Sequence, residues 1–151
     1  MKNILLTLLF LNGLISCGHK LNSEVENSVN IIIEKEIINE DSFCIRREDS
    51  YINFLGVSTN EDLVYLTNHE NQRIRYYAFL GLIDRNYPKI KEIFFKHEND
   101  TAFIYMTNGG CLRNYHNVNK LMIWELNPKD SNFKYRFTKA EYDKEYDKIT
   151  K

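Results

Sequence analysis

The sequence predicts a mostly helical fold, built from stacked helical hairpins, with a small β-hairpin near the C-terminus. Three observations support this prediction. Apolar residues return at helical spacing, between capping signals, over residues 59–86. The run His69-Glu70-Asn71 recurs as His97-Glu98-Asn99, which indicates a repeat of about 30 residues, typical of stacked helical pairs. Residues 112–126 contain Tyr115, Val118 and an aliphatic run that suit strands.

The first seventeen residues form a separate segment. Lys2 gives a short positive region, residues 4–15 are a mainly apolar run of 12 residues, and Leu14-Ile15-Ser16 leads to Cys17. A run of this length cannot cross a hydrocarbon core of ~30 Å, which takes about 20 residues. It also lacks the polar face of a surface helix. Both a membrane-spanning anchor and a core helix are therefore disfavoured.

This segment resembles the signal peptide and lipobox of bacterial lipoproteins. The resemblance implies cleavage before Cys17 and acylation of its thiol and of the new amino group. The mature chain would then be attached to a membrane by several acyl chains without spanning it. Gly18 follows Cys17, where an Asp is linked in some bacteria to inner-membrane retention, so we expect the outer membrane, facing the periplasm or the surface.

The composition limits the functional class. The chain has 151 residues and a net charge of −1, with 20 basic and 21 acidic residues, so no broad cationic surface for nucleic acid is expected. Ten Tyr, nine Phe and only two Pro and six Gly argue against a disordered or low-complexity chain. We expect residues 23–151 to form one domain.

The N-terminal part of the domain begins with a short polar tether, residues 18–22. Ser23 as N-cap and Glu26 three residues later predict a helix over residues 24–38. The β-branched run Ile31-Ile32-Ile33 favours a strand instead. We retain the helix because residues 34–36 are charged and break the alternation of a strand.

A loop over residues 39–47 carries Cys44, and a short helix over residues 48–55 should end at Gly56. The strongest local signal follows, because Thr59 and Asp62 form a capping-box pattern. Two apolar-faced segments separated by the polar residues 68–71 then predict a helical hairpin. Residues 86–88, Asn-Tyr-Pro, should end its second helix.

The pattern starts again with a short helix over residues 89–95, followed by the second His-Glu-Asn turn. A degenerate second helix, placed by matching Tyr105 to Tyr77, should end early at Gly109-Gly110. Residues 112–126 should form the β-hairpin or an edge strand. Thr138 and Glu141 form a last capping box, which predicts a charged helix over residues 139–149.

Residues 59–110 resemble HEAT-type repeats. Ile74, Arg75, Ala78 and Leu82 stand at the second-helix positions of that family, and Asn71 stands at its turn. The resemblance implies two repeats, about residues 59–86 and 87–110, stacked as in a solenoid. With the lipoprotein-like leader, residues 59–110 are similar to uncharacterised HEAT-like lipoproteins of Bacteroidetes-type bacteria. With one good repeat and one poor repeat, a long superhelical binding surface is not expected.

Cys44 and Cys111 remain once Cys17 is lipidated. In an oxidising envelope compartment an even pair suggests a disulfide, and closing such a long loop stabilises a fold by roughly 4 kcal/mol. The alternative is two buried free thiols that pack as small apolar side chains. We favour the disulfide, although connectivity does not follow from sequence.

Residues typical of catalysis or metal binding are sparse. His69 and His97, each followed by Glu, could supply metal ligands, but a site needs three or four convergent ligands and the repeat explains the match. No phosphate loop, nucleophile elbow or His-Glu-x-x-His helix occurs. We therefore expect no cofactor and no enzymatic activity. Arg75 should bond a carboxylate such as Asp62 or Asp100 within the fold.

The candidate partner-binding residues are Arg73, Tyr76 and Phe79 on the second hairpin helix. A guanidinium can hold a carboxylate through two hydrogen bonds, and exposed aromatic side chains are enriched in interfaces. The aromatic residues of this helix could equally form the core. The leading functional hypothesis is a lipid-anchored protein-interaction module. The alternatives are an immunity or inhibitor lipoprotein and a small thiol-dependent enzyme or redox protein using Cys44 or Cys111.

Overall fold

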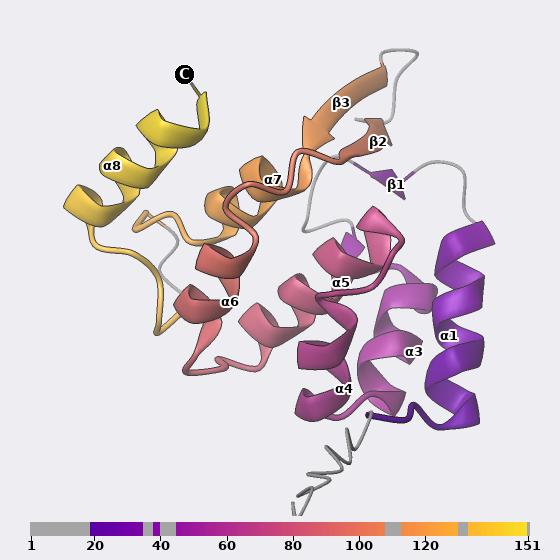
Figure 1. The fold of residues 1–151 in the computed structure, drawn as a ribbon. Coiled ribbons are helices and arrows are strands. Elements are labelled where there is room, and N and C mark those ends of the chain that lie inside the picture. Colours follow the sequence, from indigo (N-terminus) through magenta and orange to yellow (C-terminus); the bar gives the residue numbers. More distant parts are fainter. Residues whose placement is uncertain (1–18, 35–37, 40–44, 108–112, 130–132, 151) are drawn as a thin grey trace, which may run out of the picture.

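The computed structural model describes residues 19–34, 38–39, 45–107, 113–129 and 133–150 (Figure 1). The predictions that concern Cys17, Cys44 and Cys111 lie outside these residues. The described chain is mostly helical with a small β-hairpin, which confirms the predicted fold class. No helix in these ranges is long and apolar enough to cross a membrane.

Helix α1 spans Ser23–Glu34, and its buried stripe is Val25, Val29 and Ile32. The expected cap at Ser23 is wrong, because the Oδ1 atom of Asn22 accepts hydrogen bonds from the backbone N–H groups of residues 24 and 25, both at 2.9 Å. The β-branched residues 31–33 are helical, as predicted. The helix ends before residue 38, because strand β1, Ile38–Asn39, begins there and pairs with another strand.

The predicted tether is shorter than expected, because the chain is docked on the domain from His19 onward. The Nε2 atom of His19 lies 2.7 Å from Asp62 Oδ1. Leu21 packs against the hydrophobic core, and Asn22 caps α1. Contacts with the domain are therefore already made at residue 19, four residues before the first helix.

Helix α3 spans Asp49–Val57 and buries Tyr51 and Phe54. Gly56 lies inside this helix, so the prediction that it ends the helix is wrong. The helix ends at Ser58 instead, where the hydroxyl donates to the carbonyl of Phe54 at 2.6 Å.

The predicted helical hairpin is confirmed as α4, Asn60–Leu66, and α5, Gln72–Asp84. Thr59 and Asp62 form the full capping box of α4, and the side chain of Asn71 caps α5. Asn86 has a positive φ of 52°, a conformation that Asn adopts more readily than most residues, and it ends the second helix as expected. Helix α5 contacts α1, α4, α6, α7 and β2, so it forms the centre of the core.

Helix α6, Ile90–Lys96, is close to the predicted short helix. The expected second helix of the 87–110 repeat is instead strand β2, Phe103–Thr107. Ile104 and Met106 are buried while Phe103 is exposed, so this segment follows the two-residue period of a strand. The match of Tyr105 to Tyr77 therefore predicted helical spacing for a segment that is a strand.

Strand β3, Arg113–Asn117, pairs antiparallel with β2 and confirms the small hairpin. The sheet order is β1-β2-β3, with β1 parallel to β2. The second half of the segment predicted as strand is helix α7, Val118–Glu125. Its buried residues 118, 121, 122 and 125 follow helical spacing, which the strand propensity of the aliphatic run concealed.

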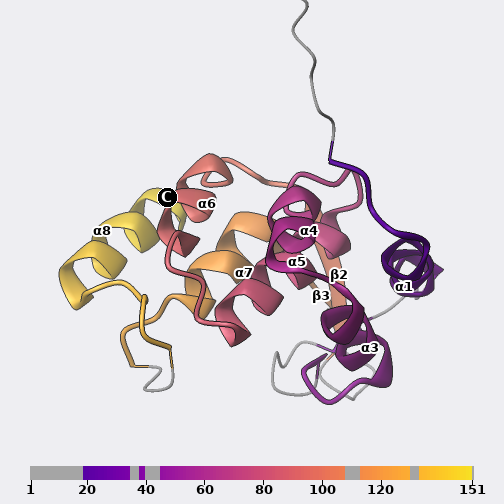
Figure 2. The same ribbon diagram turned by 90° about the horizontal axis from the view of Figure 1, so that it is seen from below.

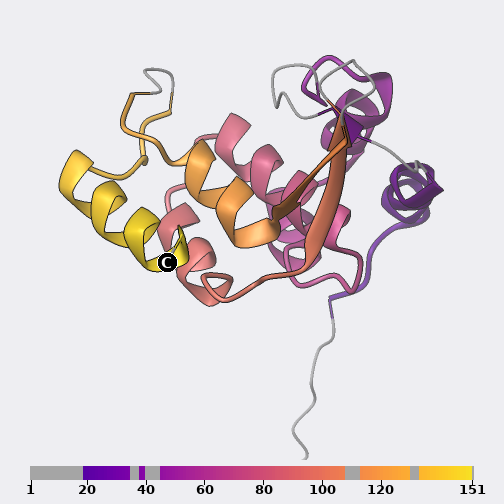
Figure 3. The same cartoon turned by 90° about the horizontal axis from the view of Figure 1, so that it is seen from above.

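Helix α8, Lys139–Thr150, begins at the predicted capping box of Thr138 and Glu141. It packs on α7 at one end of the molecule, and α1 lies at the opposite end, with α5 and α7 between them (Figure 2). The view from above shows the sheet on the side of α1 and α3, away from α8 (Figure 3).

Candidate functional site

The residues predicted to bind a partner do not form a surface. Tyr76 and Phe79 are 1% and 0% exposed, so the predicted interface is wrong and both are core residues. Arg73 donates from Nη2 to the backbone carbonyl of Ile33 at 3.1 Å and links α5 to α1. Helix α5 has neighbours on several sides, which leaves little of its surface for a partner.

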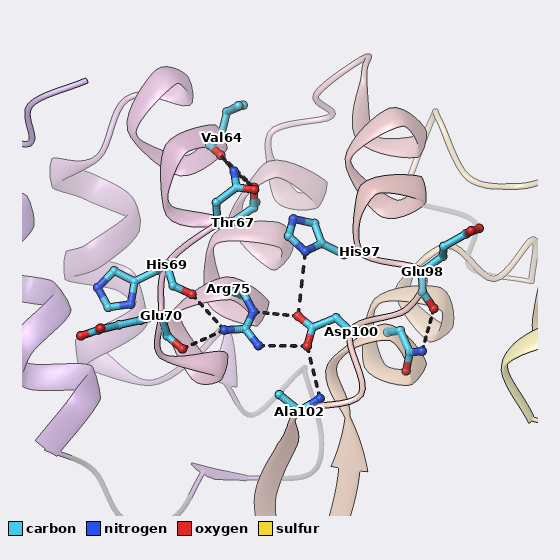
Figure 4. Close-up of polar contacts among 11 residues, drawn as sticks. Val64, Thr67, His69, Glu70, Arg75, His97, Glu98, Asp100 and Ala102 are labelled. Atoms are coloured by element: carbon cyan, nitrogen blue, oxygen red, sulfur yellow. Dashed lines mark hydrogen bonds and ion pairs between the residues drawn. The ribbon is translucent and has the colours of Figure 1, made fainter. Parts of the chain in front are cut away.

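Arg75 joins two turns of the fold (Figure 4). Its Nε and Nη2 atoms donate to the two carboxylate oxygens of Asp100 at 2.7 and 2.9 Å. Its Nη1 atom donates to the backbone carbonyls of His69 and Glu70, both at 2.9 Å. The expected structural use of Arg75 is therefore observed, with Asp100 as the carboxylate partner.

The turn at Asp100 is also held by hydrogen bonds from Ala102 and from α7. Asp100 Oδ1 accepts a hydrogen bond from the N–H of Ala102 at 3.2 Å. Asn119 on α7 donates through its backbone N–H to the Asp100 carbonyl at 3.0 Å and through its side chain to the Glu98 carbonyl at 2.8 Å. Strand β2 thus starts from a turn that is held between α5 and α7.

The two repeated histidines have internal contacts. His69 Nδ1 accepts a hydrogen bond from the N–H of Asn71 at 3.0 Å, and His97 Nδ1 lies 3.9 Å from Asp100 Oδ2. Burial lowers the pKa of both imidazoles. Within the described ranges, no three His, Cys, Asp or Glu side chains converge as a metal site would need.

A second polar cluster, which the sequence analysis missed, joins α3, α5, α7 and residue 46. The guanidinium of Arg46 lies 2.6 Å from Asp84 and 3.1 Å from Glu125. Tyr51 donates to Asp84 at 2.6 Å, and Tyr76 donates to Glu125 at 3.0 Å. Burial, followed by the neighbouring carboxylates, raises the pKa of both tyrosines, so they are phenol donors. The cluster satisfies its own groups and acts as a structural link.

Aromatic side chains cover the solvent face of the β-hairpin. Phe103 and Tyr115 are 60% and 64% exposed, and Tyr105, which pairs with Tyr115 across the hairpin, is half-buried. The Tyr105 and Tyr115 ring centroids lie 4.8 Å apart, and those of Phe103 and Tyr115 lie 6.4 Å apart, both in T-shaped geometry. We call these three residues the hairpin aromatic face.

The backbone of Tyr115 is turned to the open side of the sheet. The N–H of Val118 donates to the carbonyl of Ala102 at 3.0 Å. Because hydrogen-bonded pairs alternate in an antiparallel ladder, Tyr105 and Tyr115 form a non-hydrogen-bonded pair. The N–H and carbonyl groups of Tyr115 therefore point away from β2. Within the described sheet, β3 is an edge strand next to an exposed aromatic cluster.

The sequence contained a signal for this face. Residues 103–106 alternate aromatic and aliphatic side chains, Phe-Ile-Tyr-Met, between polar segments. That alternation is typical of a half-buried strand. The match of this segment to the preceding helical repeat led instead to the prediction of a helix.

A surface groove of about 320 Å³ lies beside the start of the described chain. We call it the tether groove. Its lining comes from α4, the end of the α4–α5 hairpin and the N-terminal segment: His19, Asn60, Glu61, Val64, Tyr65, Asn68 and Tyr87.

Comparison with known proteins gives no match: no family model, no curated protein and no solved structure is similar to this chain. Its function is therefore argued from its own residues.

Proposed function

We propose that this protein is a lipid-anchored component of a bacterial cell envelope that binds a protein partner through the hairpin aromatic face. The observation that carries the proposal is the exposure of Phe103 and Tyr115 on one face of the β-hairpin. Exposed aromatic clusters mark interaction sites, because burying such rings in a partner removes a large apolar area from water. The resemblance of residues 1–17 to a lipoprotein leader supports the anchor.

The face is organised before a partner binds. The three rings contact one another, and β2 starts from the turn that Arg75 and Asn119 hold. Side chains that are already restricted lose less conformational freedom on binding, which favours affinity. The open edge of β3 can additionally accept an extended segment of a partner through main-chain hydrogen bonds.

The helices support this face. The HEAT-like resemblance accounts for the packed pair α4–α5, while the β-hairpin supplies the exposed side chains. On this proposal the protein faces the periplasm or the cell surface, and its partner is a protein of the same compartment. Binding needs neither a cofactor nor a reactive thiol.

The test is site-specific photo-crosslinking in cells that express the full-length protein at its native level. A photoreactive phenylalanine analogue replaces Phe103 or Tyr115, and in the control it replaces Ile52, which is 53% exposed on α3. The proposal predicts one discrete adduct from positions 103 and 115 and none from position 52. No adduct, or the same adducts from all three positions, would contradict it.

Affinity measurements on the partner identified in this way complete the test. Phe103→Ala and Tyr115→Ala should each weaken binding by at least about fivefold, because truncation of a central aromatic residue typically costs about 1 kcal/mol or more. Ile52→Ala should leave the affinity unchanged. A toxin or wall hydrolase in the adduct would make the protein an inhibitor of that enzyme.

A further inference from the structure

The N-terminal segment is fixed to one face of the domain. The Nε2 atom of His19 lies 2.7 Å from Asp62 Oδ1, and its ring lies over Tyr65 with centroids 5.0 Å apart. Leu21 packs on the core, and the next residue, Asn22, caps α1. The chain therefore enters the domain beside the tether groove, at a defined position.

The short covalent connection limits the distance between this face and a lipid anchor at Cys17. His19 follows Cys17 by two residues, which span at most about 7 Å when fully extended. On the basis of the proposed lipid anchor, we infer that the tether groove and the exposed side of α4 lie against the headgroup layer of the bilayer. This surface is a membrane-contact face whose occupant is phospholipid.

The side chains of this face suit that position. Tyr65 is exposed and Tyr87 is half-buried, and both line the groove together with the amides of Asn60 and Asn68. Tyrosine is enriched at membrane–water interfaces, because its ring is apolar and its hydroxyl is polar. Glu61 is the one carboxylate among the lining residues, so contact does not depend on anionic lipid.

The orientation places the hairpin aromatic face away from the membrane. The described chain starts beside α4, and β2 and β3 lie at the other end of α1 (Figure 1). Helix α1 has 12 residues and is about 18 Å long. The membrane-contact face and the hairpin therefore lie toward opposite ends of α1, which leaves the hairpin open to a partner.

The experiment uses tryptophan fluorescence of the full-length lipidated protein in phosphatidylcholine vesicles. The chain has one tryptophan, Trp124, which is replaced in a Trp124→Phe background. Into this background Tyr65→Trp or Tyr115→Trp is introduced, both at exposed positions. Quenching by lipids that carry a nitroxide on the headgroup then reports the distance of each tryptophan from the bilayer surface.

The inference predicts clearly stronger quenching at position 65, on α4, than at position 115, on β3, because α4 lies by the start of the described chain and β3 lies at the other end of α1 (Figure 1). His19→Ala should reduce this difference, whereas Lys20→Ala, at the exposed neighbouring residue, should preserve it. Equal quenching at the two positions, in protein that floats with the vesicles, would overturn the orientation alone. Failure of the Cys17-containing protein to float with vesicles would overturn the anchor and the orientation together.

Discussion

Arg75 and Asp100, 25 positions apart in the chain, meet in a bidentate ion pair of which both members are mostly buried. The pair connects helix α5 to the turn that leads into β2. Charged hydrogen bonds of this kind contribute more than neutral ones, because both N–H groups align with both oxygens. The Arg75–Asp100 pair therefore helps to fix the position of the hairpin aromatic face, although Arg75 lies on α5.

Arg75→Lys should lower the free energy of unfolding by about 2 kcal/mol, because an ammonium cannot reproduce the four hydrogen bonds of the guanidinium. Chemical denaturation of the purified protein measures this loss. Arg136→Lys is the matched control, since among the described residues Arg136 donates one side-chain hydrogen bond, to the Phe133 carbonyl at 2.7 Å. An equal loss in both variants would show that the Arg75–Asp100 pair has no special role.

Two glycines in helices should respond differently to alanine. At Gly56 a methyl group would meet nothing within 4 Å, so Gly56→Ala should raise the free energy of unfolding by about 0.5–1 kcal/mol through helix propensity. At Gly81 the new methyl would lie 3.1 Å from Leu55 Cδ1 and 3.2 Å from Leu63 Cδ1. Gly81→Ala should therefore raise the free energy of unfolding by less than Gly56→Ala does. A larger increase at position 81 would contradict the α4–α5 packing.

Ala78 tests the same hairpin from the core side. Its side chain is fully buried, so Ala78→Leu should lower the free energy of unfolding by about 1–3 kcal/mol through overpacking. Lys89→Ala, at an exposed position, should change it by less than about 0.5 kcal/mol. Thermal melts of the two variants provide the comparison, and identical melting temperatures would refute the register of α5.

Stability should fall as the pH is lowered through about 6.5, the ordinary pKa of histidine. Burial lowers the pKa of His97, and the opposing effect of Asp100 does not restore it. The unfolded chain then binds a proton that the folded chain does not, so folding is favoured fully above pH 6.5 and loses this contribution below it. His97→Gln should flatten the fall in unfolding free energy between pH 7.5 and 5, and an unchanged slope would exclude His97 as its source.

The cysteine predictions concern residues outside the described ranges and remain predictions. Cys17→Ala should abolish incorporation of labelled fatty acid, since the leader contains no other thiol. Thiol counting on denatured, unreduced mature protein should find Cys44 and Cys111 oxidised, and Cys44→Ser should cost about 2–5 kcal/mol. Two free thiols in protein taken from the envelope would remove the disulfide from the fold.

Local signals in the sequence were the most reliable guides. The Thr59–Asp62 and Thr138–Glu141 capping boxes predicted the starts of α4 and α8, because such caps involve only neighbouring residues. At α1 the same logic placed the cap at Ser23, one residue too late, because Asn and Ser side chains are both good caps and the pattern does not separate adjacent ones. Asn22 forms the observed cap.

Features set by tertiary contacts were harder to predict. The repeat match suggested a helix at residues 103–107, yet pairing with β1 and β3 makes this segment a strand. Tyr76 and Phe79 were candidate interface residues, but α5 packs against elements on several sides and buries them. The exposed aromatic residues lie instead on the β-hairpin, where the alternation of residues 103–106 is present in the sequence.

The parallel pairing of β1 with β2 has a consequence for how the chain folds. Ile38 lies opposite Met106, so this contact closes a long loop and must form late, whereas α4 and α5 are neighbours in sequence and can associate early. The order of folding is therefore expected to run from the α4–α5 hairpin outward, with the sheet completed only once residues 103–117 are in place to pair with β1.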